Sequence, residues 1–176
     1  MNSNRQPSPS PLSAPALKLL ALDADDLAVL SANTQDAVIR LGDMAYLPRS
    51  KRFALVMSRF DWEGTLVGRC ERRQAGLHFE RVMQVELSGI RQDKPELVLN
   101  LLSLSFEPGV LPSGFVRLTF SGGAVIRLAV ECIEVEMHDL GLRWPARAVP
   151  GHALMDEAVD PAPQPERANE ATDKEV

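Results

Sequence analysis

A pair of alternating segments joined by a glycine-rich turn constrains the fold of this chain more than any other feature. Apolar residues occupy every second position of 116–120 and of 126–130, on either side of a Ser-Gly-Gly turn at 121–123. Both apolar sets must face the core, and opposing Leu118 to Ile126 achieves this with a three-residue loop. A two-residue loop of the two glycines would instead oppose Leu118 to an arginine. The last residue of a three-residue loop takes a positive φ, which a glycine tolerates, so we expect a three-residue hairpin.

Strand signals dominate most of the remaining chain. Residues 77–87 place Leu, Phe, Met and Val on one face, interrupted by Arg81, and place His78 on the opposite, solvent face. The Pro-Arg-Ser-Lys run at 48–51 is typical of a hairpin turn. The pattern predicts strands at 17–22, 39–47, 52–60, 77–87 and 97–106 in addition to the hairpin.

Two helices are predicted, one near each end of the folded part. Asp23 fits a helix N-cap and Asp26 adds a carboxylate to the first turn, which predicts a helix over roughly 24–36. Apolar residues at 130, 133, 137 and 140 follow helical spacing, and Gly141 fits a C-cap. The alternative is a bulged continuation of the preceding strand, because 132, 133, 135 and 137 are also apolar.

These elements predict an α+β fold in a single domain. We expect a mostly antiparallel, twisted or partly closed sheet of about six to eight strands, with one N-terminal and one C-terminal helix. The strand-hairpin-strand-helix ending resembles the last part of a pleckstrin-homology-like barrel, an analogy of fold that carries no function. The domain is expected at 17–149. Residues 1–16 are rich in Ser and Pro and 150–176 form an acidic, proline-containing tail, so both are predicted to be disordered.

The net charge of −5 arises in the acidic tail. Residues 150–176 carry seven acids against two bases, so 17–149 are close to neutral and the net charge does not exclude an anionic partner. No secretory signal and no apolar run of membrane-spanning length is visible, and the two cysteines form no disulfide framework. These features favour a cytoplasmic location with both thiols reduced, and no membrane association.

The stretch from 59 to 81 concentrates residue types that commonly contact partners. Eight Lys or Arg and four acids lie within 49–81, with aromatic residues between them. Such a basic, aromatic-containing region is able to bind an acidic partner surface, a phosphorylated ligand or RNA. The alternative is a solvated strand face whose arginines pair with nearby acids. The candidate contact surface comprises Arg59, Asp61, Trp62, Arg69, Arg72, Arg73, His78 and Arg81.

No catalytic or metal-binding set emerges from the sequence. The His and Cys residues form no C-x-x-C or H-x-x-x-H pair, and no phosphate-binding glycine loop is present. Cys70 and His78 are residue types of a nucleophile and its base, but nothing in the sequence brings them together. Trp62 is expected to close one end of the core with its N–H bonded to a carbonyl, and Trp144 to pin the C-terminal segment to the sheet. We therefore expect no catalytic residue, no metal and no cofactor.

Several segments resemble a known family. The runs L-K-L-L-A-L-D-A-D-D-L-A-V-L-S, R-F-D-W-E, E-R-R-Q-A-G-L-H-F-E-R-V and V-E-C-I-E-V-E are similar to an uncharacterised family of short bacterial proteins, catalogued only as a domain of unknown function. The resemblance covers roughly 17–147. It implies a small cytoplasmic single-domain protein and transfers no activity, cofactor or catalytic residue.

Three hypotheses for the function follow, in descending order. The first is a non-enzymatic binding or accessory module whose partner, another protein or a small anionic ligand, contacts the region 59–81. The second is an enzyme acting on a small anionic metabolite, with arginines as anion clamps and His78 or Glu80 as acid or base. The third is an RNA-binding protein.

Overall fold

A computed structural model describes residues 16–150 of the chain. The predicted disordered segments, 1–16 and 150–176, lie almost wholly outside the described residues. The strand pairs of residues 16–150 are all antiparallel.

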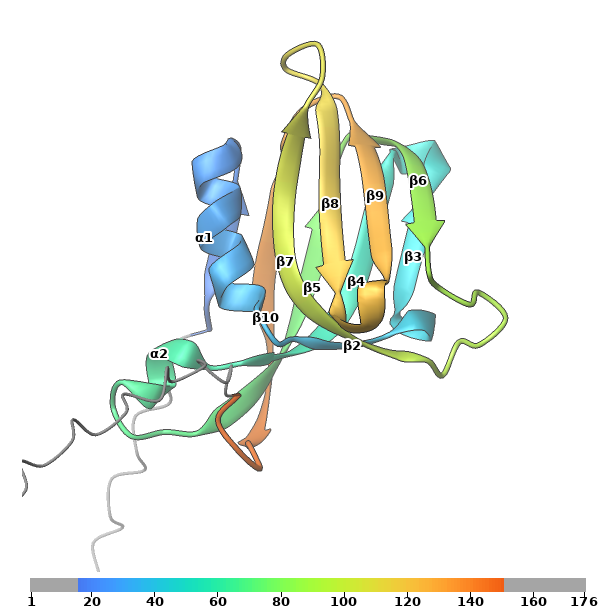
Figure 1. Cartoon of the computed structure of the whole chain (residues 1–176). Coiled ribbons are helices and arrows are strands. Elements are labelled where there is room, and N and C mark those ends of the chain that lie inside the picture. Colours follow the sequence, from blue (N-terminus) through green and yellow to red (C-terminus); the bar gives the residue numbers. More distant parts are fainter. Residues whose placement is uncertain (1–15, 151–176) are drawn as a thin grey trace, which may run out of the picture.

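Ten strands form one sheet in the order β1-β10-β5-β4-β2-β7-β8-β9-β6, with β3 beside β4 (Figure 1). The strands are β1 (Lys18–Ala21), β2 (Val38–Arg40), β3 (Met44–Leu47), β4 (Arg52–Phe60), β5 (Glu71–Phe79), β6 (Val82–Ser88), β7 (Val98–Pro108), β8 (Gly114–Phe120), β9 (Val125–Val130) and β10 (Val135–Pro145). The α-helices are α1 (Ala24–Thr34) and α2 (Trp62–Thr65). The predicted α+β class with a mostly antiparallel sheet is confirmed, but ten strands exceed the predicted six to eight.

The sheet curves so that β10, β5 and β4 lie opposite β7, β8 and β9 (Figure 1). Helix α1 packs against β7 and β1 and covers the side between them. The core fills the interior with side chains from both halves, including Phe53, Phe79, Leu118 and Ile126. The sheet remains open, because β3 pairs only with β4 and β6 only with β9 among the described strands. A closed pleckstrin-homology-like barrel is therefore not shown.

The hairpin predicted from the alternating segments is confirmed in register and loop length. Leu118 lies opposite Ile126, and the N–H of Phe120 donates to the carbonyl of Ala124 at 2.9 Å. The loop between them is the Ser-Gly-Gly turn, and Gly123 has a φ of 80°. The apolar pattern predicted this register because a shift of one residue would place the two apolar sets on opposite faces of the sheet, with one of them in water.

The N-terminal helix is also confirmed. The Asp23 carboxylate accepts a hydrogen bond from the N–H of Asp26 at 2.8 Å, as an N-cap does. Leu27 and Leu30 point into the core. The helix ends at Thr34, two residues before its predicted end.

Two predicted strands are each broken by a turn. The strand expected at 39–47 divides into β2 and β3 around a single helical turn at Leu41–Asp43. The strand expected at 77–87 divides into the end of β5 and β6, because Arg81 adopts a φ of 59° and reverses the chain. The reversal explains why Arg81 interrupted the apolar face. It also leaves Met83 and Leu87 exposed, where one continuous strand would have buried them.

The predicted C-terminal helix is wrong, and the bulged-strand alternative describes the segment. Val135, Met137 and Asp139 face inward at every second position of β10, which pairs with β1 and β5. The register shifts between Asp139 and Arg143. Helical spacing and strand alternation share residues 133 and 137, so the apolar pattern could not separate them. Pairing with two distant strands decided the outcome.

Candidate functional site

The stretch 59–81 runs from the end of β4 through α2 to β5 and the turn after it (Figure 1). Successive side chains of a strand point to opposite faces of the sheet. The neighbours Arg72 and Arg73 are therefore separated: Arg73 is buried with the inward residues of β5, and Arg72 lies on the outward face. The stretch consequently contributes to two different environments.

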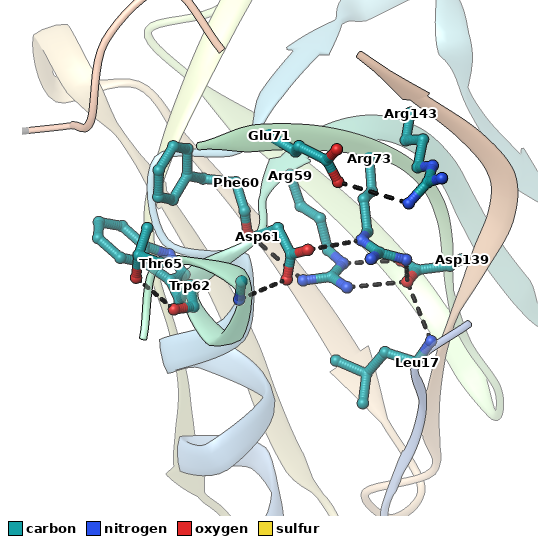
Figure 2. Close-up of polar contacts among 11 residues, drawn as sticks. Leu17, Arg59, Phe60, Asp61, Trp62, Thr65, Glu71, Arg73, Asp139 and Arg143 are labelled. Atoms are coloured by element: carbon teal, nitrogen blue, oxygen red, sulfur yellow. Dashed lines mark hydrogen bonds and ion pairs between the residues drawn. The ribbon is translucent and has the colours of Figure 1, made fainter. Parts of the chain in front are cut away.

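The inward environment is a buried ion-pair cluster that we call the arginine–aspartate cluster, formed by Arg59, Asp61, Arg73 and Asp139 (Figure 2). Arg59 binds Asp139 through two bonds, Nε to Oδ1 at 2.7 Å and Nη2 to Oδ2 at 2.8 Å. Arg73 donates from Nε to Oδ2 of Asp61 at 2.8 Å. Its Nη1 lies 3.6 Å from Oδ2 of Asp139 and links the two pairs. Two cations and two anions balance, as burial requires.

Asp139 is the centre of the arginine–aspartate cluster. Its side chain and that of Arg59 are each 2% exposed. Burial by itself raises the pKa of Asp139, but hydrogen bonds from Arg59 and from the N–H of Leu17, with the charges of both arginines, hold that pKa below its usual range. The Leu17 contact, at 3.0 Å, also ties the start of β1 to β10.

Asp61 joins the cluster to helix α2. Its Oδ1 accepts a hydrogen bond from the N–H of Gly64 at 3.2 Å, so one carboxylate both caps α2 and pairs with Arg73. A Cβ at Gly64 would lie 2.8 Å from Oδ2 of Asp61, which explains why a glycine occupies this position. Arg59, Asp61 and Arg73 are thus buried and do not belong to a contact surface. Their chemistry is that of internal ion pairs.

The opposite end of β5 carries His78 and, in the following turn, Arg81. The His78 side chain is partly buried, with Nε2 3.6 Å from Oε1 of Glu80. Arg81 is exposed and pairs with Glu134 at 3.2 Å. Cys70 precedes β5, and eight residues of extended chain separate it from His78 by about 26 Å. Its Sγ instead lies 3.9 Å from the carbonyl of Ala146, so Cys70 and His78 form no catalytic pair.

The outward environment is a cleft of about 820 Å³ beside Arg72, which we call the basic cleft. In register, Trp144 of β10 lies opposite Arg72 of β5. Nη1 of Arg72 donates to the carbonyl oxygens of Ser58, at 2.9 Å, and Asp36, at 3.2 Å. Apolar residues of the segment after β10 complete the wall. The polar and aromatic lining consists of Asp36, Arg72, Asn100, Ser121, Trp144 and Arg147.

Arginines without an acidic partner gather at this end of the molecule. Among residues 16–150, Arg69, Arg72 and Arg147 form no ion pair, whereas most other cations do. The N–H of Ala146 donates to the carbonyl of Cys70 at 2.9 Å, which brings the chain at 147 beside that at 69. Asp36 is the one carboxylate lining the described part of the basic cleft. Two arginines and one aspartate thus line the described part of the cleft.

Trp62 lies at the start of α2, close to the arginine–aspartate cluster (Figure 2). Its ring meets the ring of Phe60 edge-on, with centroids 4.7 Å apart. The predicted bond from the Trp62 N–H to a carbonyl is not formed: Nε1 is buried without a partner in the described part of the chain.

The sequence reasoning missed Asp139, Asn100, Ser121, Trp144 and Arg147 as site residues. Asp139 lies in the segment predicted as a C-terminal helix, whereas a strand over 135–139 places its carboxylate in line with the inward residues Val135 and Met137. The segment around Trp144 was correctly expected to lie on the sheet, since Trp144 belongs to β10 and pairs in register with β5. Asn100 and Ser121 give no sequence signal, because only the curvature of the sheet brings β7 and the hairpin loop towards β5.

Nowhere in residues 16–150 do three or more His, Cys, Asp or Glu side chains gather so that they could hold a metal ion. No helix in the same range has the length and apolarity needed to cross a membrane.

Comparison with known families gives one match. A family model described as "Protein of unknown function (DUF2948)" matches residues 17–152, which is most of the chain. Neither the curated proteins nor the solved structures contain a match.

Proposed function

Because the chain belongs to the DUF2948 family, whose function is unknown, we propose a function from its own geometry: a non-enzymatic cytoplasmic module that binds an anionic group in the basic cleft. The anionic group belongs to another protein or to a small ligand. In either case the chemistry of recognition is the same, an anion held by guanidinium groups beside an aromatic ring.

The observation that supports the proposal most is the hydrogen bonding of the Arg72 guanidinium. Its guanidinium is half-buried and bonded only to main-chain carbonyl oxygens, through one of its two terminal nitrogens. A guanidinium has five N–H donors, and that of Arg72 forms no ion pair with a carboxylate within 4 Å among the described residues, although Asp36 lines the same cleft. An anion entering the basic cleft would meet the remaining donors. Trp144 and Arg147 would lie beside it.

The distance between Arg72 and His78 argues for binding and against the enzyme hypothesis. Six residues of extended strand separate them by about 20 Å, too far for an anion clamped by Arg72 to be within reach of His78 or Glu80. The cytoplasmic assignment is supported by the thiols, since Cys70 and Cys132 are both free and cytosolic cysteines stay reduced.

The test uses the pair of substitutions Arg72→Gln and Arg147→Gln in one chain. We expect inorganic phosphate or a short glutamate-rich peptide to shift the NMR signals of the Trp144 indole N–H and the Asn100 side-chain amide. The double variant should bind at least about tenfold more weakly. Both probes present an anion to the arginines, and comparing them shows whether the cleft prefers a small anion or an acidic polypeptide.

The matched control is Arg49→Gln. Arg49 also lacks an ion pair among the described residues but lies in the turn between β3 and β4, outside the basic cleft. Binding should be unchanged in this variant. The proposal fails if neither probe shifts these signals, or if all the arginine variants weaken binding equally, which would indicate general charge attraction.

A further inference from the structure

The curved sheet has an open seam between β3 and β6 (Figure 1). Each of these strands pairs on one side only, β3 with β4 and β6 with β9. Within residues 16–150 no backbone ladder joins β3 to β6. An edge strand leaves every second N–H and C=O without a sheet partner, so the seam is bordered by two rows of peptide groups able to accept another strand.

The floor of the seam is an apolar groove of about 380 Å³. It reaches the core itself, because Phe53 and Ile126 are buried core residues that line it. Met44 and Tyr46 line it from β3, and Val85 and Leu87 from β6. Leu87 is 37% exposed, so this apolar side chain of the groove is only partly covered.

Hydrogen bonds close the two ends of the seam and hold its width. At one end the Tyr46 hydroxyl donates to the carbonyl of Met83 at 3.0 Å, and the N–H of Val82 donates to the carbonyl of Lys51 at 2.7 Å. At the other end the N–H of Gly42 donates to the carbonyl of Pro95 at 2.8 Å. The stretch 84–88 of β6 lies between these closures. Its free edge is fixed in place and does not depend on a partner to form.

We propose that the seam binds an extended segment of a partner protein, which adds as a strand to the free edge of β6 and directs alternate apolar side chains into the groove. The unpaired peptide groups call for a polypeptide in extended conformation, since only its N–H and C=O groups repeat at the spacing of a strand edge. The groove accepts side chains from one face of that segment only.

The charged residues that border the seam, which we call its rim, indicate the composition of the segment that binds. Five ion pairs lie on the strands and turns next to the seam: Arg40 with Asp43, Lys51 with Glu131, Arg52 with Glu80, Arg127 with Glu86, and Arg91 with Asp93. Lys94 and Glu96, which form no ion pair among the described residues, carry opposite charges, so the surroundings of the seam are close to neutral. A rim that is already neutral offers nothing to a charged segment. The partner segment is therefore uncharged, with apolar residues at every second position. This site is separate from the basic cleft and does not rest on the proposed function.

A second copy of this protein fits the seam less well than a free segment does. A strand lying between β3 and β6 has both of its edges turned to this protein, so it must have no sheet partner of its own. The β6 strand of a second copy is already paired with β9. The occupant is thus a segment that is not part of a folded sheet.

The experiment measures amide hydrogen exchange and NMR shifts of β6 with a short peptide of alternating valine and threonine. We expect the peptide to slow exchange of amides within 84–88, and a scrambled peptide with a central proline to have no effect. Leu87→Lys, which places a charge over the groove, should weaken binding by at least about tenfold. The control Leu140→Lys changes a leucine of similar exposure, 43%, on β10 away from the seam, and should bind normally.

Three results would overturn the proposal. The first is absence of peptide protection in the wild-type protein while its fold is intact by circular dichroism. The second is equal weakening by Leu87→Lys and Leu140→Lys. The third is protection of the β6 amides without peptide, combined with a dimer in light scattering that Leu87→Lys dissociates, which would assign the edge to a second copy.

Discussion

Asp139→Asn is the substitution that most directly tests the arginine–aspartate cluster. It conserves the shape of the side chain but removes the negative charge and replaces one acceptor oxygen with an N–H₂ donor. Asp139 accepts two bonds from Arg59 and one from the N–H of Leu17, and its Oδ2 faces Arg73. The change would turn a neutral cluster into one with a net charge of +1. It would also leave the N–H groups of Arg59 facing an N–H₂ donor where a carboxylate oxygen accepts in the wild-type protein.

The expected cost is large. Removing one partner of a buried ion pair typically costs about 3–5 kcal/mol, because the other charge stays buried without compensation. With a urea dependence of about 2 kcal/mol per molar, the unfolding midpoint should fall by about 2 M. Arg40→Gln is the control: its pair with Asp43 is exposed to solvent, and exposed ion pairs contribute little to stability.

Equilibrium urea unfolding followed by tryptophan fluorescence measures both variants, and Trp62 lies beside the cluster as a reporter. A loss below about 1 kcal/mol for Asp139→Asn, or a loss no greater than that of Arg40→Gln, would refute the reasoning. A double variant, Arg59→Met with Asp139→Leu, should recover part of the loss, since an apolar pair of similar size leaves no charge buried.

The same aspartate gives the cluster a defined pH dependence. The folded pKa of Asp139 lies below its ordinary value of 3.8, so the unfolded chain takes up the proton first as pH falls. The stabilisation is therefore complete above about pH 5 and is lost as the pH drops through 3.8 towards the folded pKa. The urea midpoints of the wild-type protein and Asp139→Asn should differ clearly at neutral pH and lie closer together at about pH 3. A difference that persists undiminished at the lower pH would contradict the assignment.

Two further substitutions test the backbone architecture. Met137→Ala should lower the free energy of unfolding by about 2–5 kcal/mol, because Met137 is fully buried in β10. Leu140→Ala should cost much less, because Leu140 is exposed. On the predicted helix both residues would lie on one apolar stripe, so equal losses in urea unfolding would argue for a helix. Gly114→Ala should cost about 1–3 kcal/mol, since a Cβ there would lie 2.5 Å from the carbonyl oxygen of Glu107 and from the Phe106 ring. Gly76→Ala, whose Cβ would meet nothing closer than 3.6 Å, should be tolerated, and equal thermal midpoints for both glycine variants would refute the argument.

Sequence reasoning succeeded where local chemistry determines the structure. The 116–130 hairpin was predicted to the residue because two apolar alternations and a glycine turn agree on one register. The N-cap at Asp23 was recognised from a capping residue followed by an acidic first turn. It failed in β10, where Ile133 and Met137 satisfy helical and strand periods alike, and the outcome depended on pairing with β1 and β5.

The candidate site was harder to predict for a related reason. Composition along 59–81 identified a basic region but not which face each side chain occupies, and burial of Arg59 requires Asp139, which lies 80 residues away in the sequence. The alternation of β5 was itself readable: once the strand begins at 71, Arg72 and Arg73 must point to opposite faces. The partner carboxylates and the cleft walls come from strands that only the folded sheet brings near β5.

The separation of these two neighbouring arginines determines how the protein's binding function must be tested. Substituting both together would break the buried pair between Arg73 and Asp61 as well as the basic cleft, so loss of binding would report unfolding as readily as loss of a contact. Arg72 alone can be changed with the cluster intact.

The arginine–aspartate cluster also joins β4, β5 and β10 at the end where Arg72 and Trp144 lie opposite each other. An anion binding there would meet a guanidinium already held by two carbonyl oxygens on a braced sheet, and little ordering would be needed for it to bind. We therefore expect association without rearrangement of the backbone, and a large rearrangement of β5 on binding would show that the cleft is not preformed.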